Sequence, residues 1–435
     1  MILDHHPFNI NDVGHLAIGG IDAVGLSEKY GTPLYVYDVS LIRANCRRFV
    51  ETFEALGVRA QVAYASKAFS SVAMLQVIKQ EGLSLDVVSQ GELYTALQAQ
   101  FPVDRIHMHG NNKSANELEM AIDYDIGCIV VDNFHEIELI NEILQRKNKT
   151  MDVLMRVTPG IQPNTHQYIV TGNEDSKFGF NLADGQADEA FLQLQNSENI
   201  HFKGLHSHIG SQLFETDAFV LAAKVLFRKL ADWHAEYHYS PDVLNLGGGF
   251  GIRYTEGDQP LDYSTHVKEL TAVVQEQAAY FNMPLPEIWI EPGRAIAGNA
   301  GVTLYTVGSI KEIPGVRNYV SVDGGMTDNI RPALYHAKYE GVLANKAGKT
   351  ATDTVSIAGK CCESGDMLMW DLPVPAVESD DILAVFSTGA YGYSMASHYN
   401  RFPKAAVVFV ENGRDQLVIK RETYHDVVKN DISYE

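Results

Sequence analysis

The chain has 435 residues, 46% of them hydrophobic, so it is long enough for two or three domains with sizeable cores. Its 34 basic and 55 acidic residues give a net charge of −21, which argues against nucleic acid and anionic membranes as partners. No apolar run approaches the roughly 18 residues of a membrane span, and the first residues lack the features of a signal peptide. The four cysteines form no CxxC pair, so we expect a reducing, cytoplasmic environment.

The first 38 residues have the pattern of short strands and turns, and an amphipathic helix is predicted to follow them. Apolar side chains recur at helical spacing at Ile42, Cys46, Phe49, Phe53 and Leu56. This spacing puts Cys46 on the buried stripe of the helix, so we interpret it as a structural cysteine.

From residue 60 onward, short apolar strand candidates alternate with helix-like stretches. The strand candidates begin near Ala60, Leu83, Ile106, Ile129, Val153, Phe202, Val243 and Ile288. Eight strands alternating with helices are typical of a (β/α)8 barrel, an α/β fold, with a doubly wound open sheet as the alternative.

Polar residues follow these strand candidates where each strand is expected to end. They are Lys67, Asp86, His109, Asn111, Asp132, Arg156, His206, His208, Gly247 to Gly249, Glu291 and Arg294. In a barrel the carboxyl ends of the strands converge on one mouth, where enzymes of this fold keep their chemistry. Asp132 directly precedes a predicted helix and is interpreted instead as an ordinary helix cap.

After about residue 298 the pattern changes to short β-rich runs divided by Gly, Pro and Asp. The runs cover residues 302–307, 319–322, 354–358, 382–386, 406–410 and 416–419. We therefore predict a barrel domain at residues 36–298. Residues 1–35 and 299–435 are predicted to form a β-rich domain that completes the active site and the dimer interface.

Three motifs point to chemistry at the predicted mouth. Lys67 follows an apolar strand, where an amine can be made nucleophilic, although a surface lysine is the simpler interpretation. The glycines at 247–249 could cradle a phosphate with their backbone amides, or form only a tight turn. Glu291 and Arg294 could supply a buried acid and an anion-binding guanidinium, or only a salt bridge.

His206 and His208 lie on one face of a predicted strand. Metal ligation is conceivable there, but no neighbouring set of Asp, Glu or Cys completes a site, so we predict no metal. A ring-stacking histidine fits better beside a lysine nucleophile, a phosphate cradle and a buried acid. Together these four features are what pyridoxal 5'-phosphate requires.

The ordered set of motifs resembles that of the fold-type III pyridoxal-phosphate decarboxylases, and most closely the diaminopimelate decarboxylase family. The resemblance runs essentially from end to end. Its motifs lie at residues 64–67 (Tyr-Ala-Ser-Lys), 206–211, 247–249, 291–294 (Glu-Pro-Gly-Arg), 329–335, 362–366 and 389–391.

The resemblance implies that Lys67 forms a Schiff base with the cofactor, that His208 stacks on its ring and that Glu291 pairs with the ring nitrogen. The implied cofactor-binding residues are Lys67, Asp86, His208, Ser211, Gly248, Gly249, Glu291, Arg294 and Tyr391. The implied substrate-binding residues are Arg294, Arg331, Tyr335, Glu363 and Tyr391, a set that suits a substrate with an amino-acid group at each end.

Cys362 resembles the proton donor of the family, and the ordinary thiol pKa of about 8.5 suits that task. The alternative is a packed thiol, which is our prediction for Cys361. In the family this cysteine and Glu363 reach into the neighbouring subunit's site, so a homodimer with shared active sites is expected. The chain departs from the family at Gln90, where glycine is usual, and at His398, where asparagine is usual.

The expected function is the decarboxylation of meso-2,6-diaminopimelate to L-lysine and carbon dioxide, the last step of lysine biosynthesis. Related decarboxylases of ornithine, arginine or carboxynorspermidine are the nearest alternative, but their substrates need no clamp for a distal carboxylate. A racemase and a catalytically inactive regulatory binder are the remaining alternatives. The Cys-Glu motif at 362–363 argues against the racemase, and the intact Lys67, Glu291 and Cys362 argue against the binder.

Overall fold

The computed structural model describes residues 5–161 and 175–435, which form two compact units. The barrel unit comprises Ala44–Gly251 and Pro260–Ala295, and the β-rich unit comprises Met1–Arg43, Ile252–Gln259 and Ile296–Glu435. Among the helices described, none is long and apolar enough to cross a membrane. The predicted division of tasks between residues 36–298 and the rest of the chain stays a prediction.

Eight parallel strands of the barrel unit close into a ring. They are β5 (Ala60–Ala65), β6 (Ser84–Val87), β7 (Ile106–Met108), β8 (Cys128–Val131), β9 (Met151–Thr158), β11 (Ile200–His206), β12 (Val243–Asn245) and β13 (Glu287–Ile290). Each strand pairs with the next, β8 pairs with β9, and β13 returns to pair with β5. The predicted (β/α)8 barrel is confirmed, and the open sheet is wrong because β13 and β5 are joined. A two-residue strand, β10 (Phe180–Asn181), pairs with β9.

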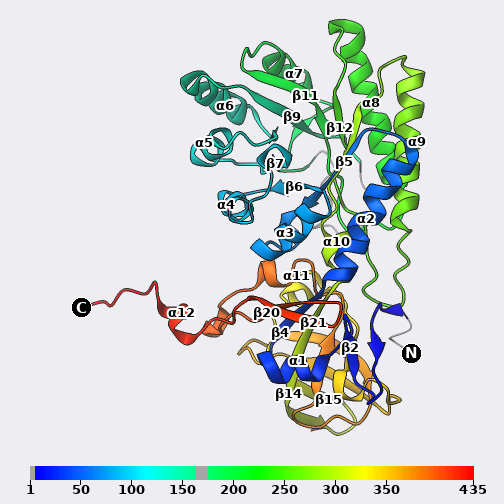
Figure 1. The fold of residues 1–435 in the computed structure, drawn as a ribbon, viewed down its shortest axis with the longest axis vertical. Helices are drawn as coiled ribbons and strands as arrows, with labels where there is room; N and C mark the ends of the chain where they lie inside the picture. Colours follow the sequence, from blue (N-terminus) through cyan, green and yellow to red (C-terminus); the bar gives the residue numbers. More distant parts are fainter. Residues whose placement is uncertain (1–4, 162–174) are drawn as a thin grey trace. The chain divides into compact units, whose positions relative to one another are not determined.

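Helices connect these strands and lie around the outside of the ring (Figure 1). They are α2 (Val39–Leu56), α3 (Val72–Gln80), α4 (Gln90–Gln98), α5 (Ala115–Asp123), α6 (Phe134–Lys147), α7 (Gln186–Gln195), α8 (Asp217–Tyr237) and α9 (Tyr263–Tyr280). The short helix α10 (Arg294–Ala297) follows β13, the last strand of the ring. The predicted apolar stripe of α2 is buried: Ile42, Cys46 and Phe49 have no exposed surface, whereas Leu56 at its end is 37% exposed.

The interior of the ring is packed with side chains. Cys128 of β8, Leu154 of β9, Val243 of β12 and Trp289 of β13 belong to one cluster of buried residues. Because β8 and β9 lie on a different part of the ring from β12 and β13, these side chains can meet only across its interior. The barrel is therefore closed by a packed core below its mouth, and its chemistry is restricted to the strand ends.

The β-rich unit is built on a sheet in the order β18-β17-β15-β14-β4-β20-β21, in which β19 also pairs with β14 and with β16. Its strands are β4 (Leu34–Asp38), β14 (Gly301–Ile313), β15 (Arg317–Val322), β16 (Gly341–Leu343), β17 (Asp353–Ala358), β18 (Met367–Val374), β19 (Ile382–Val385), β20 (Ala406–Glu411) and β21 (Arg414–Ile419). All six predicted strands are present. The sheet also takes in β4, as expected of the N-terminal segment, because β4 pairs with both β14 and β20.

A small sheet of β1 (Asn9–Ile10), β2 (Leu16–Ile18) and β3 (Ile21–Asp22) completes this unit, together with the helices α1 (Ala23–Tyr30), α11 (Arg331–Tyr335) and α12 (Tyr424–Val428). Leu16 and Ile18 of β2 pack into the same buried cluster as Val36 of β4 and Val408 of β20. The first residues of the chain and its last strands therefore share one core, which joins sequence segments almost 400 residues apart.

Candidate active site

Lys67 stands directly beyond the end of β5, in the short 3-10 turn η2 (Ser66–Ala68). Its side chain is exposed, whereas Ser66 and Ala68 on either side of it are buried. A Cβ atom added at Gly293 would lie 3.0 Å from the Cβ of Ala65 and 3.2 Å from that of Ala68, so the turn is backed closely by a residue that must be small. The amine is thus held at the mouth of the barrel on a rigid support.

Glu291 follows β13 and is the buried acid that the sequence predicts, with 6% of its surface exposed. Its Oε1 accepts a hydrogen bond from Asn245 Nδ2 at 2.6 Å and lies 2.9 Å from His109 Nε2. Its Oε2 lies 3.1 Å from His206 Nε2. Burial alone would raise the pKa of Glu291, but the two facing imidazoles outweigh burial and hold this pKa well below its ordinary value.

Asp86 lies at the carboxyl end of β6, as predicted, and is 3% exposed. Its Oδ1 has no hydrogen-bond partner among the described residues and lies 3.8 Å from His109 Nε2. Burial raises the pKa of Asp86 to about 6, and nearby Glu291 adds to the rise while His109 and Lys67 oppose it. Asp86 therefore belongs to the same group of charges as the lysine and the buried acid.

His208 lies two residues beyond the end of β11, and its Nδ1 accepts a hydrogen bond from the backbone N–H of Gly248 at 3.2 Å. Burial, followed by the nearby charges of Lys67 and Arg156, holds the pKa of His208 well below its ordinary value. The ring is therefore neutral at physiological pH. A neutral, fixed imidazole is suited to lie against a flat aromatic cofactor.

The glycine turn after β12 cannot carry side chains. A Cβ at Gly248 would lie 2.1 Å from the carbonyl oxygen of Glu291, and Gly249 has a φ of +111° with Gly210 O only 2.3 Å from its would-be Cβ. In the same unit, Arg294 Nη2 donates a hydrogen bond to Ser211 Oγ at 3.0 Å. A guanidinium and a hydroxyl already paired with each other are the kind of donors that bind phosphate.

In the β-rich unit, Arg331 of α11 is buried among tyrosines. Its Nε donates a hydrogen bond to Tyr339 Oη at 2.9 Å, and its guanidinium carbon lies 5.5 to 5.8 Å from the ring centroids of Tyr254, Tyr335 and Tyr391. Within residues 5–161 and 175–435 no carboxylate forms an ion pair with Arg331. A 9% exposed cation without a counter-ion is a site prepared for an anion.

Cys362 and Glu363 lie on a tight turn between β17 and β18. Cys362 is exposed, and its backbone N–H donates to Asn400 Oδ1 at 2.8 Å. The buried carboxylate of Asp366 accepts from the backbone N–H of Cys361 at 2.8 Å and thereby holds the start of the turn. Cys361 is buried, as predicted, and burial raises its pKa to about 11.

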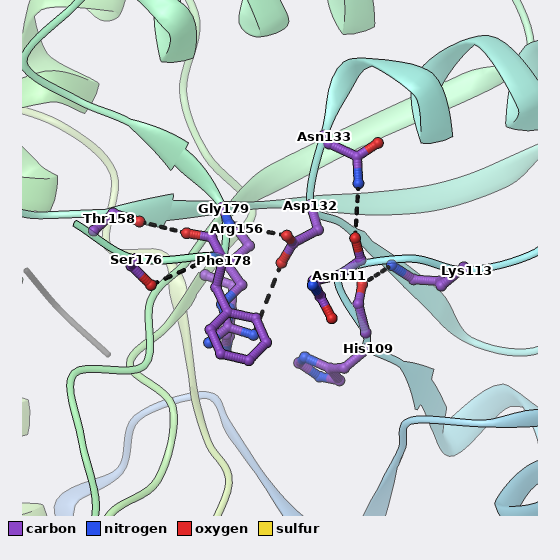
Figure 2. A network of polar contacts seen from close by, with 12 residues as sticks. His109, Asn111, Lys113, Asp132, Asn133, Arg156, Thr158, Ser176, Phe178 and Gly179 are labelled. Atoms are coloured by element: carbon purple, nitrogen blue, oxygen red, sulfur yellow. Dashed lines mark hydrogen bonds and ion pairs between the residues drawn. The ribbon is translucent and has the colours of Figure 1, made fainter. Parts of the chain in front are cut away.

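Asp132 does not cap a helix, so that prediction is wrong. The cap of α6 is Asn133, whose Oδ1 accepts from the N–H of Glu136. Figure 2 shows the Asp132 carboxylate turned instead toward Arg156 of β9 and the backbone of Gly179. The N–H of Gly179 lies 2.9 Å from Asp132 Oδ2, and the guanidinium of Arg156 stacks on the ring of Phe178. Asp132 thus ties the segment before β10 to the barrel.

Several residues of the site had no predicted role in it. His109, which the sequence places at the mouth without a specific role, lies beside Glu291 together with Asn245. For Asn245, its position at the end of β12 is the signal that could have assigned it there. Tyr254 and Tyr339 surround Arg331 but are separated from it in the sequence, and no local pattern marks them.

His109, His206 and Glu291 offer ligand atoms that all lie within 4.8 Å of one another, a spacing that a metal ion could accept. However, the carboxylate oxygens are already 2.9 and 3.1 Å from the two imidazole nitrogens. Both imidazoles therefore already face a carboxylate of the chain itself, and these contacts account for the cluster without a metal.

Comparison with known proteins connects this geometry to a family. Residues 39–298 match the family model described as "Pyridoxal-dependent decarboxylase, pyridoxal binding domain". A diaminopimelate decarboxylase of Bacillus methanolicus is 63% identical over 96% of this chain and 97% of its own length, and one of Bacillus subtilis is 61% identical over 99% and 98%.

Solved structures agree with the sequence relatives. The crystal structure of diaminopimelate decarboxylase from M. jannaschii in complex with L-lysine matches with a TM-score of 0.92 and 34% identity, and it covers 100% of this chain and 99% of that one. Both the barrel and the β-rich part of the chain are therefore shared with these relatives.

Proposed function

Because the chain belongs to the diaminopimelate decarboxylase family of pyridoxal-dependent decarboxylases, we propose that it converts meso-2,6-diaminopimelate to L-lysine and carbon dioxide. Pyridoxal 5'-phosphate is its cofactor, and the reaction is the last step of lysine biosynthesis. The observation that carries the choice of substrate is Arg331, a buried guanidinium with tyrosines around it and no carboxylate paired with it in the described residues.

The residues at the barrel mouth fit the cofactor. A carboxylate can accept about four hydrogen bonds, and Glu291 has three donors beside it, so Oε2 keeps room for the ring nitrogen. Lys67 would bind the aldehyde, His208 would lie against the ring and Asp86 would lie beside the lysine. The phosphate would be held by Ser211, Gly248, Gly249, Arg294 and Tyr391. When bound, the cofactor supplies an electron sink for the bond that breaks.

The chain's own residues then bind and orient the substrate. Arg331 and Tyr335, with Arg294, would hold the distal carboxylate, and Tyr391 would contact substrate and cofactor. Glu363 would pair with the distal ammonium group. Because charge-assisted pairs at both distal groups fix the substrate's far end, the carboxylate to be lost is presented at the cofactor.

Cys362 would return a proton to the carbon that has lost carbon dioxide. Support comes from its exposure and from the Asn400 contact that fixes its backbone. The working form would be a cytoplasmic homodimer in which Cys362 and Glu363 of one subunit complete the site of the other. In this arrangement residues 36–298 bind the cofactor, while residues 1–35 and 299–435 complete the active site and the dimer interface.

The test is a panel of amino acids assayed for carbon dioxide release with added pyridoxal phosphate. We expect turnover of meso-diaminopimelate and little or none of ornithine, arginine, lysine or carboxynorspermidine. Comparable rates on a substrate without a distal carboxylate would contradict the proposal and favour a related decarboxylase.

A further inference from the structure

The imidazole of His109 lies between two buried carboxylates. Its Nε2 is 2.9 Å from Glu291 Oε1 and 3.8 Å from Asp86 Oδ1, and all three side chains are at most 5% exposed. Two buried carboxylates this close are both ionised only with a cation between them, because burial and mutual repulsion each disfavour the second charge.

We propose that His109 is a positioning residue that carries a positive charge between Asp86 and Glu291 and keeps Glu291 an anion aimed at the cofactor's ring nitrogen. This inference rests on the proposed function, since it assigns the cofactor to this site. His206 and Asn245 are neutral groups that also contact the Glu291 carboxylate. We call the three side chains around Glu291, those of His109, His206 and Asn245, the clamp.

Charged side chains from three parts of the barrel surround His109, and the ring of His206 from β11 packs edge-on against it at 4.9 Å between ring centroids. Asp86 of β6 and Glu291 after β13 favour its protonation, whereas Arg156 of β9 opposes it. Burial would lower the pKa of His109, but the two carboxylates outweigh burial and raise this pKa above its ordinary value.

The two other imidazoles near Glu291 stay neutral. Burial lowers the pKa of His206 to about 4, and it lowers the pKa of His107, on the same strand as His109, to about 3. His107 stacks on Trp289 with 4.2 Å between ring centroids and forms no hydrogen bond or ion pair with Glu291. Of the three buried imidazoles His107, His109 and His206, only that of His109 is therefore charged.

The proposed charge decides where a proton rests. A proton shared by a carboxylate and a ring nitrogen stays on the stronger base of the two. By lowering the proton affinity of Glu291, a charged His109 leaves that proton on the ring nitrogen, which is the state of the ring that accepts electrons.

The test uses His109→Gln, which keeps a neutral hydrogen-bond donor, in the full-length protein both with the cofactor and after its removal. Melting temperature is measured from pH 6 to pH 9. A group whose pKa is raised on folding stabilises the fold below its unfolded pKa of about 6.5, and this stabilisation is lost as the pH rises through the folded value. The melting temperature of His109→Gln should therefore lie far below that of wild type near pH 6, and the difference should shrink toward pH 9.

The control is His107→Phe, which keeps an aromatic ring in the stack with Trp289 and removes no hydrogen bond or ion pair of Glu291. The difference in melting temperature between this control and wild type should not depend on pH in this way. A difference in melting temperature between wild type and His109→Gln that stays constant from pH 6 to pH 9, or that varies with pH as the control does, would overturn the proposal.

A second measurement is the dissociation constant for pyridoxal phosphate. We expect it to rise at least about tenfold in His109→Gln, since a charge that supports the Glu291 contact is lost, and to change less than threefold in His107→Phe. An unchanged affinity in both variants would also count against the clamp. If wild type released no carbon dioxide from diaminopimelate while both His109 effects appeared, the clamp would stand and the proposed substrate would be wrong.

Discussion

Lys67 and Lys113 lie in the same barrel unit but in opposite environments. Lys113 is buried, and its Nζ lies 2.8 Å from Glu136 Oε2. Lys67 is exposed and forms no ion pair in the part of the chain that the structure describes. A lysine already committed to a buried carboxylate cannot react with an aldehyde, so Lys67 is the one of the two that can act as a nucleophile.

Replacing Lys67 with alanine should abolish the absorbance of the lysine-bound cofactor and lower kcat on the order of 10³-fold or more, because no other amine can anchor the aldehyde there. The control is Lys79→Ala, since the amine of Lys79 in α3 donates to the backbone carbonyl of Gln100. Absorbance and steady-state rates distinguish the two. A Lys67→Ala protein with the wild-type spectrum would show that the cofactor is held elsewhere.

Replacing Arg331 with alanine should weaken diaminopimelate binding much more than cofactor binding. Loss of one charge-assisted pair costs about 1.5–3 kcal/mol, so KM should rise roughly 10- to 150-fold while the cofactor absorbance stays unchanged. Arg317→Ala is the matched control, because Arg317 already pairs with Asp371 at 2.7 Å. Equal KM values for the two variants would remove Arg331 from the substrate site.

At the scale of elements, a buried ion pair anchors the loop after β7 to α6. Lys113 Nζ and its backbone N–H both bond to the Glu136 carboxylate, which also accepts from the N–H of Asp132, and the two side chains are 1% exposed. Glu136→Gln should lower the free energy of unfolding by about 3–5 kcal/mol, because it leaves a buried cation unpaired. Denaturant unfolding provides the measurement.

The double variant Lys113→Met with Glu136→Gln tests the reason for that loss. Once the cation is removed as well, much of the lost stability should return. Losses that simply add in the double variant would mean that the pair is not coupled and that Glu136 acts through its backbone contacts alone.

The strand-end pattern explains how much of the fold and site the sequence could predict. Parallel strands of a barrel are short apolar runs, and their polar ends meet at one mouth, so Lys67, Asp86 and Glu291 can be selected from the sequence alone. The strand β18 is not evident from the sequence, because Asp371 and Pro373 interrupt its apolar run.

Contacts that depend on distant segments could not be predicted. Asp132 resembles a cap in sequence, but its partners arrive from β9 and from the segment at residues 176–179. Similarly, the tyrosines around Arg331 come from residues 254, 339 and 391, and only the folded β-rich unit brings them together. Local patterns carry no information about such pairings.

At the scale of the whole molecule, the four cysteines differ in their exposure to solvent. Cys46, Cys128 and Cys361 are buried, whereas Cys362 is exposed. The turn that carries Cys362 continues into a groove of about 640 Å³ on the β-rich unit, lined in part by Ser364, Met367 and the half-exposed Trp370. An exposed thiol beside a partly apolar groove is consistent with the proposed homodimer, in which a second copy of the chain would cover this face.

Mixing two inactive variants tests the proposed shared site. If Lys67 acts in one subunit and Cys362 comes from the other, Lys67→Ala and Cys362→Ala homodimers should both be nearly inactive. A heterodimer of the two collects both lesions in one site and leaves the other site intact, because every contact of a two-fold dimer occurs twice with roles exchanged. Equal amounts mixed at random give about half heterodimers, so roughly a quarter of wild-type activity should return.

Subunits can be exchanged by co-expression with two different affinity tags, and purification through both tags isolates the heterodimer. The isolated species should then have about half of wild-type activity, since one of its two sites is intact. The control pairs Lys67→Ala with itself under both tags, and it should stay inactive. If a purified heterodimer were no more active than the mean of the two parents, Cys362 would act within its own subunit's site or outside catalysis, and the inactivity of Cys362→Ala would need another cause.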